Sequence, residues 1–399
     1  MLLGRGDAFR VRRPFQFFTR GGGKNVRERS VKGKKREEKR TRARRERTYV
    51  NVAIVGALGY GGVGAVEILS RHPFVRITRL LDVTDIGRPL AELYPHLESV
   101  CDLQIEAADD PRRFRGIDFV FFATPDGVGQ VQAREWLAHG VRVIDYSGDF
   151  RFNDVASYAG YARRIGREPR HASPELLKKS AYGLAELHRK EIRRAAVVGN
   201  PGCFAVSAIL GLAPAVREGL VKFSGIVIDG KTGVSGAGKK PQAVFHYPAR
   251  YESTNAYRIS GHQHVFEMER ELSLLAGKNL RVTFTPHVVP MTRGILSTIY
   301  ADLERGIGVE ELLKEYRRFY RSEPFIRVVG PDASAATSEV RGSNYVKIWV
   351  NADMRTRKAV IVSHIDNLVK GQAGSAVQNL NVMAGFPETT ALEFPGLYP

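Results

Sequence analysis

Cysteine is scarce in this sequence, and long apolar runs are absent. Two cysteines among 399 residues cannot form a framework of several disulfides, which indicates a reducing compartment and leaves room for one reactive thiol. The longest apolar runs, such as residues 117–124 (IDFVFFAT), are too short to cross a bilayer as a helix. We therefore expect a cytoplasmic protein that does not enter a membrane.

Acidic residues are scarce only near the N-terminus. The chain has 61 Lys and Arg against 42 Asp and Glu, a net charge of +19. Residues 1–48 contain 18 of the basic and 5 of the acidic side chains, whereas residues 49–399 contain 43 and 37. The longer part therefore has the charge balance of an ordinary globular protein that can bury a core, and we do not expect it to bind nucleic acid.

The basic tail, residues 1–48, contains few apolar residues, so we expect it to be disordered. It has no apolar segment of the kind a secretory signal needs, and Ser30 is its only serine, unlike a transit peptide. One alternative is an arm that binds polyanions. Another is that the tail is not translated, since Val26, Val31 and Val50 could each mark an alternative start codon.

Strand and helix patterns alternate in the first part of the body. We expect strands at residues 49–55, 75–81, 118–123, 141–145 and 195–198, and helices at 62–71 and 129–139. Such alternation predicts an α/β fold with a parallel sheet. Further along the chain, strand-like runs have fewer helices between them, which predicts an α+β second domain. These runs are residues 225–229, 280–285, 295–302 and 347–350.

A glycine-rich loop, residues 56–62 (GALGYGG), separates the first strand from its helix. Glycines there let the backbone turn tightly and approach a pyrophosphate at the helix N-terminus. Asp82 ends the second strand, where a carboxylate could accept a hydrogen bond from a ribose. The pattern favours a dinucleotide site over a tight turn without a ligand. Asp82 by itself predicts NAD, because a carboxylate repels the 2′-phosphate of NADP.

Cys203 is the candidate nucleophile. Residues 199–202 (GNPG) force a turn after a short strand, so we expect Cys203 near a helix N-terminus. The partial positive charge there favours a thiolate and lowers the pKa of a cysteine. A thiolate can form a thioester with an activated acyl group. The alternative is a small buried thiol, which describes Cys101 well.

His264 and Glu267 are three residues apart and would share one helical face. A carboxylate could then hold the imidazole and fix its tautomer for acid–base catalysis. A zinc site built on His262 and His264 is a competing interpretation, but no third ligand is nearby in the sequence. A further competing interpretation is that the two histidines are an ordinary pair on the surface.

Two further segments could bind anions. Residues 231–239 (KTGVSGAGK) offer several backbone N–H groups in a loop, although they lack the spacing of a phosphate-binding loop of NTPases. Arg293, in residues 292–294 (TRG), could clamp a phosphate or a carboxylate. The alternatives are an ordinary turn and a solvated charge.

Taken together, these segments resemble the N-acetyl-γ-glutamyl-phosphate reductases, relatives of aspartate-semialdehyde dehydrogenase. The resemblance extends from about residue 51 to residue 399, and the tail lies outside it. The motifs that carry it are residues 56–62, 144–151, 182–187, 200–203, 233–238, 261–264, 286–296 and 364–392.

The resemblance implies a Rossmann-type dinucleotide-binding domain plus an α+β catalytic and dimerisation domain, as in glyceraldehyde-3-phosphate dehydrogenase. The first domain would span residues 49–200 and be completed by residues 364–399, and the second would span residues 201–363. Residues 370–379 would return to the first domain and close over the nicotinamide. A homodimer or homotetramer is expected.

The resemblance also implies an activity, the reduction of an acyl phosphate by NADPH to an aldehyde with release of phosphate, in arginine biosynthesis. Cys203 would form the thioester, His264 would act as acid and base, and Glu267 would orient it, without a metal. Substrate contacts would come from Asn200, His262 and Arg293. Cofactor contacts would come from Gly56, Gly59, Tyr60, Gly61, Gly62, Asp82, Ser147, Gly236 and Asn379.

Two features of the sequence leave alternatives open. Where the family often has a Ser-Arg pair suited to a 2′-phosphate, this chain has Asp82 and Val83, so NAD is an alternative to NADP, although Thr84 and Arg88 could still bind a phosphate. The C-terminal residues 393–399 (EFPGLYP) resemble relatives that reduce an aminoadipyl phosphate held on an acidic carrier protein. The motifs at residues 200–203 and 233–238 favour the free, acetylated substrate.

Overall fold

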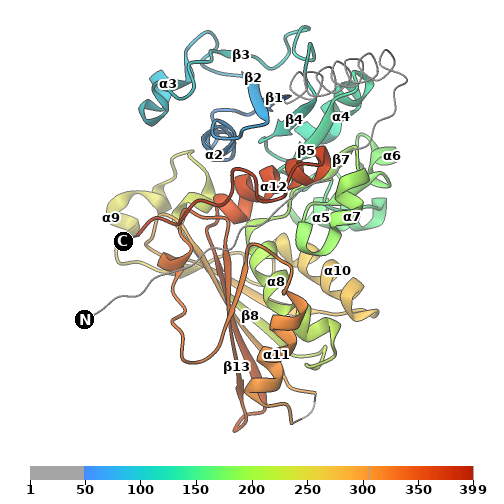
Figure 1. The fold of residues 1–399 in the computed structure, drawn as a ribbon, viewed down its shortest axis with the longest axis vertical. Coiled ribbons are helices and arrows are strands. Elements are labelled where there is room, and N and C mark those ends of the chain that lie inside the picture. The colour runs from blue at the N-terminus through green and yellow to red at the C-terminus, as the bar shows by residue number, and fades with distance from the viewer. Residues whose placement is uncertain (1–48, 305, 399) are drawn as a thin grey trace, which may run out of the picture. The chain divides into compact units, whose positions relative to one another are not determined.

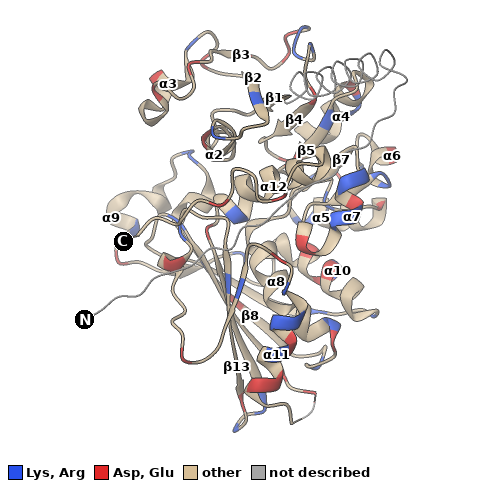
Figure 2. Cartoon of the chain, viewed as in Figure 1, with Lys and Arg blue, Asp and Glu red and all other residues tan. Residues whose placement is uncertain are grey.

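The computed structural model describes residues 49–304 and 306–398. The expected disordered tail, residues 1–48, lies outside the described residues and stays a prediction. The described chain contains two seven-stranded sheets, each accompanied by helices (Figure 1). None of the helices in this described part is both long and apolar enough to cross a membrane. Basic and acidic residues are interspersed along it (Figure 2).

The first sheet is parallel, with the strand order β3-β2-β1-β4-β5-β7-β6. Its central strands are buried on both faces, which explains why they are apolar runs without alternation. The strands are β1 (Val50–Val55), β2 (Val75–Asp82), β3 (Ile105–Ala107), β4 (Phe119–Phe122), β5 (Arg142–Asp145), β6 (Ser180–Tyr182) and β7 (Val197–Gly199). The sequence predicted five of them to within two residues at each end and missed the short strands β3 and β6.

Helices connect these strands as the alternating pattern predicted. The two expected helices correspond to α2 and α4. The helices of this part are α2 (Tyr60–Leu69), α3 (Leu90–Leu93), α4 (Val128–Ala138), α5 (Val155–Arg164), α6 (Pro174–Leu177) and α7 (Ala185–Arg194).

The second sheet is mixed, with the order β12-β13-β14-β11-β8-β10-β9. Its strands are β8 (Ile226–Thr232), β9 (Asn255–Ala256), β10 (Val282–Val288), β11 (Ile295–Asp302), β12 (Ile326–Val329), β13 (Val346–Asp353) and β14 (Lys358–Ile365). The expected α+β character is confirmed. Strands β9, β12 and β14 were not predicted.

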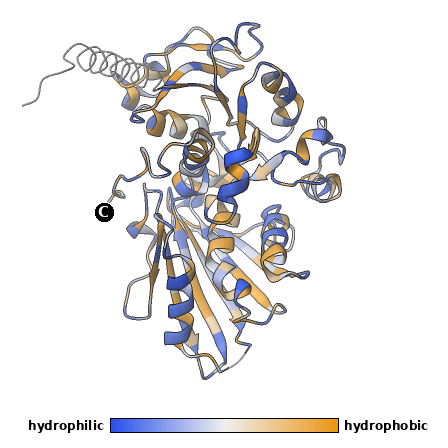
Figure 3. Cartoon of the chain, turned by 45° about the vertical axis from the view of Figure 1, so that its right-hand side comes forward, coloured by the Kyte–Doolittle hydropathy of each residue, from blue (hydrophilic) through white to orange (hydrophobic). Residues whose placement is uncertain are grey.

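One face of the second sheet packs against helices. These are α8 (Cys203–Arg217), α10 (His264–Ala276) and α11 (Val309–Phe319). Burial alternates strictly along β13, and hydrophobic and hydrophilic residues alternate along strands of this sheet (Figure 3). Such alternation is typical of a sheet with one covered face and one open face. The open face includes Val227 and Tyr300, whose side chains are exposed.

The chain leaves β14 and returns to the first sheet. A π-helical turn, η5 (Val369–Ala373), leads directly into α12 (Gly374–Ala384). Helix α12 packs against α2 and α7, and its apolar residues join the core beneath β1. The two sheets therefore belong to one packed body in which η5 forms the connection. The exact domain boundaries stay a prediction.

Candidate active site

Cys203 is the first residue of α8, immediately after the turn that follows β7. This position matches the expectation of a thiol at a helix N-terminus. Two glycines allow other groups to approach it. A Cβ atom on Gly202 would lie 2.3 Å from Nε2 of His264, and one on Gly371 would lie 2.7 Å from Cβ of Cys203. Glycine is required at both positions for this packing.

The protonation state of Cys203 differs from the sequence-based expectation. Burial raises the pKa of the Cys203 thiol to about 11, although the backbone N–H of Phe204 and the charge of Arg151 act to lower it. The prediction of a lowered pKa was therefore wrong. It counted the helix dipole and neglected the desolvation of a thiolate, which is the larger effect here. The thiol consequently needs a base.

His264 begins α10 and is buried. Burial lowers its pKa well below the usual value, and the positive charges of Arg151 and Arg258 lower it further. Its Nδ1 is buried without a hydrogen-bond partner among the described residues. The imidazole is therefore neutral at neutral pH and can accept a proton.

Glu267 does not hold His264 in the way the spacing suggested. The distance from Nε2 of His264 to Oε1 of Glu267 is 3.9 Å, beyond a hydrogen bond. The carboxylate, which is fully buried, instead accepts hydrogen bonds from Arg151 Nη1 at 2.8 Å, from the Tyr182 hydroxyl at 2.9 Å and from the Gly202 N–H at 2.9 Å. Glu267 thus fixes the turn that carries the nucleophile.

Arg151 and Tyr182 were not singled out from the sequence as site residues. Arg151 is buried and also donates to the backbone carbonyls of Tyr146 and Asn200, at 2.6 and 2.8 Å. Both residues stand within motifs that carry the family resemblance. Their role could not be read from the sequence because their partner, Glu267, lies more than 80 residues away in the chain.

His262 lies inside an aromatic cluster. Its ring packs edge-on against Phe204, Tyr257 and Phe284, and its Nδ1 accepts a hydrogen bond from the His264 N–H at 3.2 Å. Burial, together with neighbouring positive charge, lowers the pKa of His262 to about 2. This arrangement suits orientation of His264 better than direct substrate contact. Within residues 49–398, no three His, Cys, Asp or Glu side chains are grouped to hold a metal ion.

Asn200 and Asn379, expected to contact substrate and cofactor, bond to the protein itself. The Asn200 amide donates to the Gln372 carbonyl at 3.0 Å and accepts from Asn379 at 3.0 Å. Asn379 also donates to the Gly183 carbonyl at 2.9 Å. Both side chains are buried and tie together three chain segments near the turn that carries the nucleophile. Oδ1 of Asn379 has no hydrogen-bond partner among the described residues, and the contacts of both residues with ligands stay predictions.

The glycine loop has the tight geometry that a pyrophosphate site needs. Gly56 has a φ of 79°, and a Cβ atom on it would lie 2.5 Å from the Ala123 carbonyl oxygen. A Cβ atom on Gly62 would lie 2.4 Å from the Gly56 carbonyl oxygen. Gly59 caps α2 in an extended conformation. The loop therefore presents bare backbone at the N-terminus of α2, as the sequence predicted.

Asp82 ends β2 and Ser147 follows the end of β5, so both lie at the carboxyl ends of the parallel strands, as this loop does. The Asp82 carboxylate accepts a hydrogen bond from the Leu58 N–H in the loop, at 3.0 Å. Ser147 bonds through its hydroxyl and its N–H to Asp145. Burial raises the pKa of Asp145 well above its usual value. Asp82 is therefore placed beside the pyrophosphate loop, whereas Ser147 is occupied within the protein.

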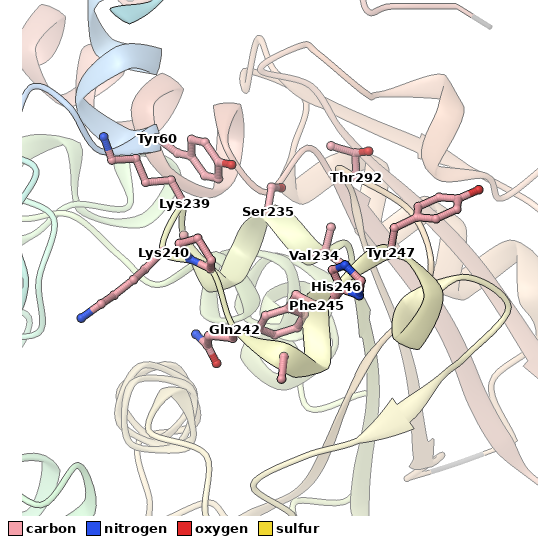
Figure 4. A pocket seen from close by; sticks show the side chains of 13 residues that line it. Tyr60, Val234, Ser235, Lys239, Lys240, Gln242, Phe245, His246, Tyr247 and Thr292 are labelled. Atoms are coloured by element: carbon pink, nitrogen blue, oxygen red, sulfur yellow. The ribbon is translucent and has the colours of Figure 1, made fainter.

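A cavity of about 710 Å³ separates the glycine loop from the second domain (Figure 4). Tyr60, at the start of α2, lines it together with Lys239, Lys240 and Tyr247. Gly236 lies in the same turn as the lining residues Val234, Ser235 and Gly238, and is not itself part of the lining. The cavity combines aromatic and cationic groups, which suits an anionic ligand with a flat ring.

Arg293 lines a second, smaller cavity, of about 280 Å³, together with Thr337 and Arg341. Its Nη1 lies 3.8 Å from Oδ2 of the buried Asp366. Asp366 also accepts hydrogen bonds from the N–H groups of Leu368 and Val369, at 2.8 and 2.9 Å. Arg293 is thus close to the residues that precede η5, and its contact with a substrate stays a prediction.

Comparison with known proteins agrees with this architecture. Residues 51–195 match the model of the semialdehyde dehydrogenase NAD-binding domain, and residues 203–367 match that of the semialdehyde dehydrogenase dimerisation domain. The structure is similar to aspartate semialdehyde dehydrogenase II of Vibrio cholerae, with a TM-score of 0.64 and 17% identity over 84% of this chain and 99% of that one. The NADP-bound enzyme of Candida albicans has a TM-score of 0.60, at 14% identity over 84% and 98%.

Sequence relatives are more specific than these structural neighbours, which show the fold alone. The N-acetyl-γ-glutamyl-phosphate reductase of Desulforamulus reducens is 43% identical over 350 residues, 88% of this chain and 100% of that protein. The reductase of Geobacter metallireducens is 45% identical over 351 residues, with the same two coverages. The chain therefore belongs to the N-acetyl-γ-glutamyl-phosphate reductase family of semialdehyde dehydrogenases.

Proposed function

We propose that this protein reduces N-acetyl-γ-glutamyl phosphate to N-acetylglutamate 5-semialdehyde and releases phosphate, in arginine biosynthesis. The observation that carries the proposal is the position of Cys203 at the start of α8, directly after Gly202, against which the neutral imidazole of His264 packs. The identity of the substrate is inferred from the names of the sequence relatives.

The first chemical step is attack of Cys203 on the acyl carbon. His264 takes the thiol proton, a carbon–sulfur bond forms, and the bond between the acyl carbon and the phosphate oxygen breaks so that phosphate leaves. A base is needed because burial raises the pKa of the Cys203 thiol to about 11. The resulting imidazolium can return its proton later in the cycle.

Reduction of the thioester needs a hydride, which a bound reduced nicotinamide supplies. The glycine loop fits a dinucleotide, because a Cβ atom on Gly56 or Gly62 would collide with backbone atoms where the loop must stay bare. Such a hydride would turn the thioester into the aldehyde, and His264 would return its proton to the Cys203 sulfur as the carbon–sulfur bond breaks. Glu267 and Arg151 keep the turn before Cys203 in place during these steps.

The proposed cofactor is NADP, with NAD as the alternative that Asp82 favours. Asp82 lies beside the glycine loop, where its negative charge opposes a 2′-phosphate. Arg88, which could have offset this charge, is paired with Asp85 at 2.9 Å and with Glu92 at 3.5 Å. A comparison of turnover with the two reduced nicotinamides decides between them.

A carrier-linked substrate is the second candidate raised by the sequence. The relatives described above are reductases of the free, acetylated substrate by name, and they do not favour the carrier-linked alternative. Efficient turnover of free N-acetyl-γ-glutamyl phosphate is the expected result. A strict requirement for a carrier protein would reverse this choice.

We further propose that the protein works as a homodimer or homotetramer, assembled through the open face of the second sheet. Val227 on β8 and Tyr300 on β11 are directly paired on that face and are 38% and 40% exposed. The family model that covers this region is a dimerisation domain. The cytoplasm is the proposed location, since a reducing compartment keeps the free thiols of Cys101 and Cys203 reduced.

The activity is tested in the reverse direction, by phosphate-dependent oxidation of N-acetylglutamate semialdehyde with each oxidised nicotinamide. We expect reduction of the nicotinamide that depends on inorganic phosphate and that is lost in Cys203→Ser. A folded wild-type protein that is silent with both nicotinamides would reject the proposed function.

A further inference from the structure

The π-helical turn η5 touches two functional loops at once. Its middle residue, Gly371, lies against the nucleophile, because a Cβ atom there would be 2.7 Å from Cβ of Cys203. The next residue, Gln372, packs on the glycine loop, where a Cβ atom on Gly61 would be 2.9 Å from its Nε2. The Gln372 carbonyl also accepts the hydrogen bond from Asn200. One short turn thus spans the distance between thiol and dinucleotide loop.

Lys370, the residue before Gly371, carries a buried charge. Its side chain is fully buried, and its Nζ lies 2.5 Å from Oε1 of Glu186 and 2.7 Å from Oε1 of Gln378. The ammonium also lies 5.7 Å from the ring centre of Phe325. These groups surround it completely, so it cannot contact a substrate. Glu186 is in the first turn of α7 and Gln378 is in α12.

The surroundings of Glu186 reinforce this pairing. Gln378 Nε2 donates to the same Glu186 oxygen at 3.1 Å and to Glu388 at 2.8 Å. Burial acts to raise the pKa of Glu186, but the charge and hydrogen bond of Lys370, together with hydrogen bonds from the backbone and Gln378, outweigh burial and leave that pKa below its usual value. Glu186 is therefore a carboxylate in the folded protein. Two buried charges cost desolvation energy that an apolar pair would avoid.

Other features of the turn show how the charge is connected to the backbone. The Lys370 carbonyl accepts a hydrogen bond from the Ser375 hydroxyl at 2.6 Å, and the Gly371 N–H donates to the Asp366 carbonyl at 2.9 Å. The wider π-helical turn is an unusual conformation that often occurs at functional sites. A fixed Lys370 side chain therefore holds the backbone of the next two residues in one position.

We propose that Lys370 is a positioning residue, whose ion pair with Glu186 fixes η5 so that Gly371 and Gln372 hold the Cys203 thiol and the dinucleotide loop in register. The kinetic part of this inference rests on the proposed function, and the binding part does not. Misplacement of the reacting groups by about 1 Å can cost on the order of 100-fold in rate, so a small movement of the turn has a large effect.

The binding test compares four proteins: wild type, Lys370→Met, Lys370→Arg and the control Lys347→Met. Lys347 is a largely buried lysine of β13 that pairs with Glu339 at 2.8 Å. Alkylation of Cys203 by iodoacetamide is measured with and without saturating NADP⁺. We expect the dinucleotide to slow alkylation about tenfold in wild type and less than about threefold in Lys370→Met, because the coupling between the two sites passes through the turn.

Further measurements distinguish a positioning role of Lys370 from a merely structural one. In Lys370→Met we expect the NADP⁺ dissociation constant and the alkylation rate without nucleotide to stay within about threefold of wild type, because each loop keeps its own contacts. In turnover we expect a fall in kcat of about 10- to 100-fold with little change in KM for the acyl phosphate. The deuterium isotope effect on kcat should rise, since hydride transfer becomes slower than the other steps. Lys370→Arg should restore part of the coupling.

The inference would be overturned if NADP⁺ slowed the alkylation of Cys203 equally in Lys370→Met and Lys347→Met and if the two variants had equal kcat values. A Lys370→Met protein in which nucleotide affinity, thiol reactivity and thermal stability decline together would overturn it too, because that pattern describes general loosening. If Lys370→Met does not fold, the same measurements are made on Glu186→Gln. This substitution keeps a hydrogen-bond acceptor for Lys370 and removes the negative charge. A wild type without turnover would reject the proposed function, while the protection experiment would still decide the role of Lys370.

Discussion

At the scale of single residues, the site depends on groups that were predicted and on partners that were not. Cys203, His264 and Glu267 follow from local turn and helix signals in the sequence. Arg151 and Tyr182 do not, because they meet Glu267 only through the fold. Sequence reasoning also misjudged the pKa of Cys203, since burial is a property of the folded chain and cannot be read from a helix start.

Asp82 is expected to influence the choice of cofactor. Replacing Asp82 by Ser removes a negative charge beside the glycine loop, so we predict that kcat/KM with NADPH, divided by that with NADH, rises about tenfold or more. Steady-state kinetics with both nicotinamides measure this ratio. An unchanged ratio in Asp82→Ser would show that another residue selects the cofactor.

His262 is expected to make the protein less stable in acid. Its pKa is lowered to about 2 in the folded protein, chiefly by burial, so between that value and the ordinary 6.5 only the unfolded chain is protonated. Stability is therefore complete above about pH 6.5 and falls as the pH decreases, by about 2 kcal/mol at pH 5.

Thermal unfolding between about pH 5 and pH 7 measures this dependence. We predict that His262→Asn, which keeps an acceptor for the His264 N–H and cannot titrate, flattens the decline of Tm with falling pH. His139→Asn, at an exposed position, is the control. An equally steep decline in His262→Asn and wild type would contradict the prediction.

At the scale of elements, the sequence predicted what local pattern determines. Apolar runs such as β1 and β4, and the alternating β11, were found close to their true bounds. Strands β3, β6 and β12 are three or four residues long, too short to give a pattern, and exist because neighbouring strands pair with them. The turn η5 was not predicted either, because its conformation is imposed by contacts from several segments.

The turn before α8 provides a prediction with a close control. Gly202 and Gly308 are both extended N-cap residues, of α8 and of α11. A Cβ atom on Gly202 would collide with His264, whereas one on Gly308 would meet nothing within 4 Å. We predict that Gly202→Ala lowers kcat about 100-fold by displacing the imidazole and that Gly308→Ala does not change it. Equal kcat values in the two variants would refute the placement of His264.

At the scale of the whole molecule, two sheets are joined by a returning C-terminal segment. The alternating elements predicted the parallel sheet, and the later strand-like runs with fewer helices predicted an α+β second domain. The family resemblance predicted the return of the chain to the first sheet. The contacts of Lys370 and Asn200 with segments more than 150 residues away were beyond sequence reasoning, because nothing local marks them. The open face of the second sheet also exists only at the scale of the whole molecule, because it depends on which face the helices cover.

Assembly is expected to depend on that face. Val227→Asp places a charge beside Tyr300 on the open face, and burying an unpaired charge in an interface is strongly unfavourable. We predict that it converts an oligomer to a smaller species in sedimentation experiments. Val131→Asp, at a residue of α4 that is 64% exposed, is the matched control. An unchanged mass for Val227→Asp would exclude this face as the interface.

The central claim is that Cys203 becomes acylated by the substrate. It is tested most directly by mass spectrometry of the protein mixed with N-acetyl-γ-glutamyl phosphate in the absence of nicotinamide. We predict one added N-acetylglutamyl group, located on the peptide that contains Cys203, removed by hydroxylamine and absent from Cys203→Ser. Full turnover by Cys203→Ser, or an acyl group on another residue of a competent enzyme, would contradict the account.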